Sequence, residues 1–182
     1  MTDKQLKAFG AVLIVIVALV ALARWNAARP TSTAVAPVDL KSLKDSPIDK
    51  IVLESQEGSV TLAKTSAGWS VGTSTADTEA VTKFWKTIEA ATFNEIVSTN
   101  PENQATFGVS GPTVRKYAFF EGDKKKAELI IGSTTDAPGA FYVKVAGRKD
   151  VWSVTAPFDT IPTAADAWKA KAPPKPAKTP KK

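Results

Sequence analysis

The pattern of hydrophobic and polar positions divides the chain into stretches with different periods. It begins with an apolar run, Ala8–Ala23, that contains no charge and has no polar face. From Ile48 onward apolar and polar residues alternate, which indicates strands, but between Val81 and Ala91 apolar residues recur three and four positions apart, which indicates a helix. Alternation then returns and continues to Thr155. The pattern predicts an α+β domain, a mostly antiparallel sheet with one main amphipathic helix, preceded by a single transmembrane helix.

Short turns join the predicted strands, and a capping residue marks the start of the predicted helix. Strands around Ile51, Val60 and Trp69 are separated by turns that contain glycine, which predicts an antiparallel meander. Asp77 is a favourable N-cap because its carboxylate can accept hydrogen bonds from the first free N–H groups of the helix. Trp168 is expected to pack against the body from a short helix. The other predicted elements are the strands Phe93–Ser98, Val114–Phe120, Ala127–Ile131, Phe141–Val145 and Val151–Thr155, and a turn of helix capped by Asn100.

The apolar run at residues 8–23 is interpreted as a membrane anchor, so that residues 1–27 form a cytoplasmic stub and a transmembrane helix in contact with membrane lipid. A helix of this length covers about 24 Å, less than the ~30 Å hydrocarbon core. Trp25 can lie at the interface, and the flanking basic side chains can extend toward water. A cleaved signal peptide is the competing interpretation, because Ala21-Leu22-Ala23 fits the usual cleavage pattern. A buried helix of a soluble domain is the third.

The rest of the chain separates into three parts by composition. Residues 28–47 are rich in Ala, Thr, Ser and Pro and are expected to form a flexible spacer. Residues 48–170 are expected to fold as the exported α+β domain. Residues 171–182 read KAPPKPAKTPKK, which offers nothing to a core, and are expected to form a disordered Lys/Pro-rich tail. This tail could attach electrostatically to an anionic lipid or polymer.

The positive charge of the chain is confined to its two ends. The formal net charge is +6, of which residues 1–30 carry +3 and residues 171–182 carry +5. Residues 31–170 carry −2. The folded part therefore has no excess of basic residues, which argues against a nucleic-acid-binding surface.

The chain lacks histidine and cysteine, and this excludes several kinds of chemistry. Ser-His-Asp triads, thiol nucleophiles, disulfides and His- or Cys-ligated metal sites all require one of these residues. No phosphate-binding or hydrolase motif is present either. We therefore predict no catalytic, cofactor-binding or metal-binding residues and no cofactor. The lysine run Lys124–Lys126, between Glu121 and Asp123 and the next strand, is read as a solvated turn, with anion binding as the alternative.

An ordered set of short motifs in the domain resembles the domain of unknown function 4340 family. Val109 and Trp152 stand where that family usually has Leu and Tyr, and the resemblance covers about Ile48–Trp168. The resemblance implies a bacterial membrane-anchored envelope protein. Some members of that family are encoded beside gliding-motility-type ABC transporter components. The resemblance implies no catalytic residues, and the motif residues read as turn and packing residues. The motifs are Gly68-Trp69, Phe107-Gly108-Val109 with Pro112, Ile131-Gly132, Gly139 with Phe141-Tyr142-Val143, and Val151-Trp152-Ser153-Val154.

These observations favour a non-enzymatic, membrane-tethered envelope domain that docks onto a protein partner, as an accessory component of a transporter or surface machinery. The expected location is the bacterial inner membrane, single-pass, with the amino end cytoplasmic and the domain periplasmic or extracellular. The alternative is an envelope ligand-binding or enzymatic domain acting on glycan or lipid, including a hydrolase that works without His or Cys. That alternative needs an accessible aromatic side chain among Trp69, Trp85, Trp152 and Trp168.

Overall fold

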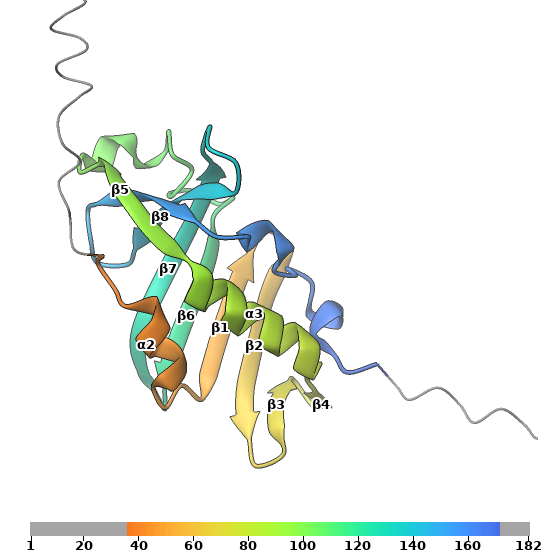
Figure 1. Cartoon of the computed structure of the whole chain (residues 1–182). Coiled ribbons are helices and arrows are strands. Elements are labelled where there is room, and N and C mark those ends of the chain that lie inside the picture. Colours follow the sequence, from red (N-terminus) through yellow and green to blue (C-terminus); the bar gives the residue numbers. More distant parts are fainter. Residues whose placement is uncertain (1–35, 172–182) are drawn as a thin grey trace, which may run out of the picture. The chain divides into compact units, whose positions relative to one another are not determined.

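The computed structural model describes residues 36–171, which form a single nine-stranded antiparallel sheet with one main helix, α3, across one face (Figure 1). The strand order is β4-β3-β2-β1-β6-β7-β8-β9-β5. This confirms the prediction of a mostly antiparallel sheet with one main helix. The strands are β1 (Lys50–Ser55), β2 (Gly58–Thr65), β3 (Gly68–Val71), β4 (Ser74–Thr75), β5 (Thr92–Ser98), β6 (Arg115–Glu121), β7 (Lys124–Thr134), β8 (Ala140–Val145) and β9 (Val151–Thr155). The helices are α2 (Leu40–Asp45) and α3 (Thr78–Ala90), with single 3₁₀ turns η1 (Pro101–Gln104), η2 (Phe158–Thr160) and η3 (Ala165–Trp168).

Helix α3 begins where the sequence predicts, because Asp77 caps it. One carboxylate oxygen of Asp77 accepts hydrogen bonds from the backbone N–H groups of Glu79, at 2.8 Å, and Ala80, at 3.2 Å. These bonds satisfy two of the N–H groups that the first turn leaves free. The predicted apolar stripe of α3 is buried against the sheet through Val81, Phe84, Trp85 and Ile88.

An aromatic cluster centred on Phe84 joins the helix to the sheet. Its ring lies 6.0 Å from Tyr117 and 6.0 Å from Phe119 of β6, and 5.9 Å from Trp168 of η3. Trp168 is fully buried, and its indole N–H donates to the carbonyl of Pro162 at 3.1 Å. The expectation that Trp168 packs against the body is thus confirmed.

The prediction that residues 28–47 form a flexible spacer is wrong for their last part, because Leu40–Asp45 forms the helix α2. Asp39 caps this helix, and Leu40 and Leu43 are 3% and 6% exposed. Two apolar residues three positions apart are too few to establish a period, so the hydrophobic pattern could not reveal a six-residue helix. The folded part therefore begins before residue 48.

The predictions for the two ends of the chain fall on residues outside those described. These are the apolar run 8–23 and all of the predicted tail 171–182 except its first residue. Within residues 36–171, no helix is both long enough and apolar enough to cross a membrane.

The segment between β5 and β6 is fixed onto β7 and β8 by three of the sequence motifs. The ring of Phe107 lies 4.7 Å from that of Tyr142, and the Phe107 carbonyl accepts a hydrogen bond from the backbone N–H of Ser133 at 3.1 Å. Gly132 lies against the same carbonyl, and Gly108 lies against Ser133. A side chain at either glycine would collide with these atoms, which explains why glycine stands at both positions.

The two edges of the sheet differ. The residues that follow η3 run alongside β4, where the backbone N–H of Ala170 donates to the Thr75 carbonyl at 3.0 Å. At the opposite edge β5 pairs only with β9, and two bulges interrupt that pairing. Among residues 36–171, β5 is therefore the long edge strand with an open side.

Candidate functional site

The charged side chains do not gather into a site for acid–base or metal chemistry within residues 36–171. No group of three or more Asp and Glu residues that could hold a metal ion occurs there. In the lysine run, Lys125 pairs with Glu128, and Lys126 pairs with Glu121 at 2.6 Å. Two of the three lysines are therefore neutralised by neighbours, as a solvated turn requires. The prediction that the chain has no catalytic or cofactor-binding residues stays a prediction.

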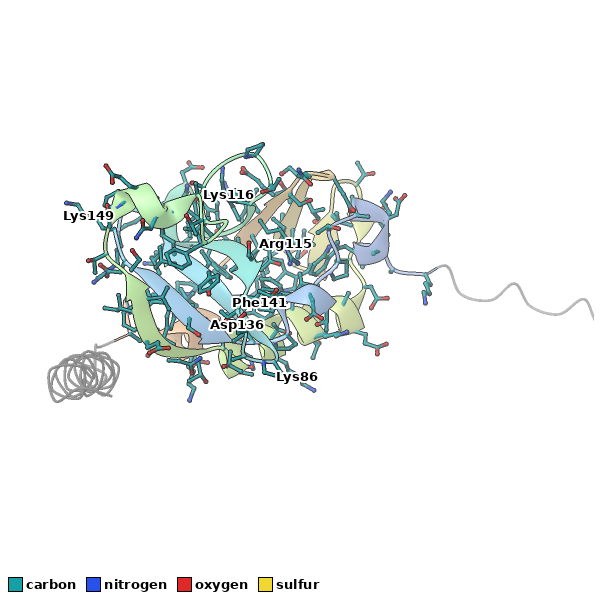
Figure 2. The ribbon with its side chains drawn as sticks, turned by 90° about the horizontal axis from the view of Figure 1, so that it is seen from above. Lys86, Arg115, Lys116, Asp136, Phe141 and Lys149 are labelled. Atoms are coloured by element: carbon teal, nitrogen blue, oxygen red, sulfur yellow. The ribbon has the colours of Figure 1, made fainter. Side chains whose placement is uncertain are left out.

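Three polar side chains lie in the core or at its edge, on β6 and β9. The Arg115 guanidinium donates to the Phe158 carbonyl at 3.1 Å and lies over the Phe141 ring, at 6.0 Å from its centre (Figure 2). The hydroxyl of Tyr117 and the indole nitrogen of Trp152 are buried without a hydrogen-bond partner. Burial raises the pKa of Tyr117 above its usual value, and the nearby Arg115 charge offsets part of that rise. Tyr117 and Trp152 are enclosed and Arg115 is half-buried, so we interpret these side chains as packing residues of the core and its edge.

Of the four described tryptophans, two border the same hollow on the surface. Trp152 and Trp168 are enclosed in the core, whereas Trp69 is only half-buried. The Trp69 ring lies 6.5 Å from that of Trp85, at 52° to it. The aromatic surface that the ligand-binding alternative needs is therefore limited to this pair.

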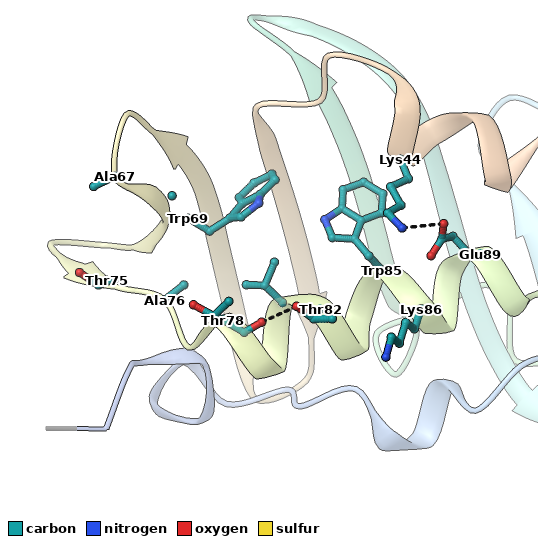
Figure 3. Close-up of a pocket in the computed structure, with 12 residues that line it drawn as sticks. Lys44, Ala67, Trp69, Thr75, Ala76, Thr78, Thr82, Trp85, Lys86 and Glu89 are labelled. Carbon is teal, nitrogen blue, oxygen red and sulfur yellow. Dashed lines mark hydrogen bonds and ion pairs between the residues drawn. The ribbon is translucent and has the colours of Figure 1, made fainter. Parts of the chain in front are cut away.

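The Trp69–Trp85 pocket is a hollow of about 350 Å³ between α3, the β3–β4 hairpin and the end of α2 (Figure 3). Strand β3 supplies Trp69, and the buried stripe of α3 supplies Trp85 and Val81. Its volume falls in the range of small-ligand sites. The other lining residues are Lys44, Ala67, Gly68, Thr75, Ala76, Thr78, Thr82, Lys86 and Glu89.

Hydrogen-bond donors and cations dominate the polar lining of the Trp69–Trp85 pocket. The Lys44 ammonium pairs with the Glu89 carboxylate at 2.8 Å, whereas Lys86 forms no ion pair with any residue in 36–171. The indole nitrogens of Trp69 and Trp85 have no hydrogen-bond partner in that range, and both keep some accessible surface. Figure 3 shows the Trp85 nitrogen directed toward the space beside Trp69. The pocket therefore combines apolar ring surface with donors that are not in use.

Sequence reasoning identified the two tryptophans but not the pocket. Trp85 lies in the predicted helix and Trp69 in a predicted strand, and the structure confirms both positions. Lys44 belongs to the helix that the pattern missed, and its partner Glu89 lies 45 residues away in the chain. No local signal links such a pair, so the polar rim could not be predicted.

The comparisons with known proteins agree with the motif-based resemblance. The family model described as "Domain of unknown function (DUF4340)" matches residues 69–179, which is more than half of the 182 residues. The match begins at Trp69 in β3 and extends past η3, whereas the motifs suggested a start near Ile48. No curated protein and no solved structure matches the chain significantly. The chain therefore belongs to the domain of unknown function 4340 family.

Proposed function

We propose that this chain is a non-enzymatic, membrane-tethered envelope domain that docks onto a protein partner by adding a partner strand to the open edge of β5. The anchor would be the apolar run at residues 8–23, with the amino end cytoplasmic and the domain on the outer side of a bacterial inner membrane. The partner would be a subunit of a transporter or surface machinery. The absence of His and Cys supports a binding role rather than catalysis.

The contrast between the two sheet edges carries this proposal. The β4 edge is two residues long, Lys169 and Ala170 run beside it, and its Thr75 carbonyl already accepts a hydrogen bond from Ala170. No described residue pairs with the outer side of the seven-residue strand β5, although residues 36–41 lie near its first two residues. An exposed edge presents a row of free N–H and C=O groups, and strand addition is a common way to bind a peptide segment.

The side chains of β5 indicate the chemistry of the partner strand. Ile96 is 37% exposed and is the one large hydrophobic side chain classed as exposed among the described residues. Its neighbour Glu95 is exposed and forms no ion pair within them. A partner segment with an apolar residue near Ile96 and a basic residue near Glu95 would complement both. The two bulges would restrict pairing to a strand whose register tolerates them.

Site-specific photocrosslinking in intact cells tests this proposal. A photoreactive amino acid is introduced at Ile96 in one variant and at Thr61, an exposed position in β2, in the control. We expect an adduct with another envelope protein from position 96, a weaker or absent adduct from position 61, and loss of the first adduct when Glu95→Lys is added. Adducts only with a second copy of the chain, or equal adducts from both positions, would contradict the proposal.

Amino-terminal sequencing of the protein from fractionated cells tests the anchor separately. An intact amino terminus in the membrane fraction is expected. A mature chain that starts shortly after Ala23 would instead identify the run as a signal peptide, and the tether would be absent.

A further inference from the structure

We propose that the Trp69–Trp85 pocket binds an acidic sugar unit, that is, a hexuronate residue of an anionic glycan. This inference does not rest on the docking proposal, because the pocket is formed by α2, α3 and the β3–β4 hairpin, whereas β5 lies at the other edge of the sheet. The two proposals can therefore fail independently.

The apolar wall of the pocket suits a sugar ring. A pyranose presents a face of C–H groups that packs on an aromatic ring, and the half-buried Trp69 offers such a ring beside Trp85. Val81 and Ala76 extend the apolar surface, and hydroxyl groups of Thr75, Thr78 and Thr82 lie in the same lining. Thr82 donates its hydroxyl hydrogen to the Thr78 carbonyl at 2.7 Å, so the oxygen of Thr82 remains able to accept a hydrogen bond.

The polar groups of the pocket select an acidic ligand over a neutral one. The two indole N–H groups and the Lys86 ammonium are donors without partners among residues 36–171. Lys44 and Glu89 neutralise each other, so Lys86 gives the lining a net positive charge. In Figure 3 the Lys86 ammonium lies on the side of α3 away from the two indole rings, so this exposed side chain has to turn toward the pocket to meet a ligand. A carboxylate would pair with this charge and accept from an indole N–H, whereas an alkyl chain would bury these donors without partners.

The charge also argues against the chain's own tail as the occupant. The segment 172–182 starts one residue after Lys171 and is proline-rich, so it could reach an aromatic pocket. It carries four lysines and no acidic side chain. Its charge therefore repels that of Lys86, and an anionic ligand is favoured instead.

Calorimetric titration of the full-length protein with three probes tests the proposal. The probes are a hexuronate trisaccharide, the neutral hexose trisaccharide with the same linkage, and benzoate, which has a carboxylate and a flat ring but no sugar. We expect the acidic trisaccharide to bind about tenfold more tightly than the neutral one at low salt, and more tightly than benzoate. Equal binding of the two trisaccharides, binding of benzoate at least as tight as that of the acidic trisaccharide, or no binding of any probe at millimolar concentration would overturn the proposal.

Variants locate the binding in this pocket. Trp69→Ala should abolish binding of the acidic trisaccharide, and Lys86→Gln should remove its advantage over the neutral one. Lys83→Gln is the matched control, because Lys83 is an exposed lysine of the same helix outside this pocket and should leave both affinities unchanged. Circular dichroism checks that Trp69→Ala is folded. A folded Trp69→Ala protein with unchanged affinity, or an equal loss in Lys83→Gln and Lys86→Gln, would place the binding elsewhere and refute the assignment.

Discussion

Gly132→Ala should destabilise the domain by about 2–4 kcal/mol, although it adds only one methyl group. The backbone of Gly132 is not in the left-handed region, so the cost comes from the surrounding atoms. A Cβ atom there would lie 2.3 Å from the Phe107 carbonyl oxygen, 2.8 Å from Cγ1 of Val109 and 3.0 Å from the Gly108 carbonyl carbon. Two of these three atoms are backbone, so no side-chain rotation can relieve the contact.

The magnitude follows from what must move. The oxygen has to retreat by about 1 Å to reach an ordinary contact distance, and overpacking of this kind costs about 1–3 kcal/mol. The retreat also weakens the hydrogen bond from Ser133 to Phe107, which contributes about 1 kcal/mol. For a domain of this size the sum corresponds to a melting temperature lower by roughly 8–16 °C.

Urea and thermal unfolding followed by circular dichroism measure the effect, with Gly122→Ala as the control. Gly122 has a φ of 57° and open space around its Cβ position, so alanine there meets backbone strain of about 1 kcal/mol but no collision. We expect Gly132→Ala to cost clearly more than Gly122→Ala. A loss of 1 kcal/mol or less in Gly132→Ala would refute the reasoning, because it would show that the Phe107–Val109 segment is free to move away from β7.

Two further substitutions test the core and the newly found helix. Tyr117→Phe removes a buried hydroxyl without a partner and should raise the free energy of unfolding by about 1 kcal/mol. In the unfolded chain Tyr117 loses its proton near pH 10, whereas the buried side chain retains it because its pKa is raised. The wild-type protein should therefore lose stability as the pH rises above about 10, and denaturant titrations should show a smaller loss in Tyr117→Phe. Leu43→Ala should lower the free energy of unfolding by about 2–4 kcal/mol in the same titrations. Lys41→Ala, on the exposed side of α2, should change it by less than about 0.5 kcal/mol. Equal effects of the two substitutions would show that α2 does not pack on the core.

The elements that could be predicted from the sequence are those whose signal is local. Helix α3 has its cap, its apolar stripe and its end within one short stretch, and each strand shows its alternation within a few residues. The short helix α2 and the two-residue strand β4 offer too few positions for any period, and they were missed.

The candidate site depends on contacts between distant parts of the chain, which is why the sequence did not reveal it. Trp69 meets Trp85 because β3 is the next-to-last strand on the side of the sheet where α3 begins. The structure confirms that the motif glycines Gly108 and Gly132 have a structural role. Their shared position against one loop depends on the register of β7 and β8, which no local pattern specifies.

The position of Trp168 in the core has a consequence for a chain that emerges progressively from the ribosome. Helix α3 is complete at residue 90, but one side of Phe84 stays uncovered until Trp168, many residues later, has emerged. Strand β5 has no pairing partner until β9 has emerged, and the outer side of β4 stays open until Ala170 has emerged. A nascent chain that ends before Trp168 exposes one side of Phe84 and the outer side of β4, and one that ends before β9 leaves β5 unpaired as well. Such exposed surface makes it a target for chaperones and proteases. We therefore expect the domain to complete its core only after residues 168–170 have emerged.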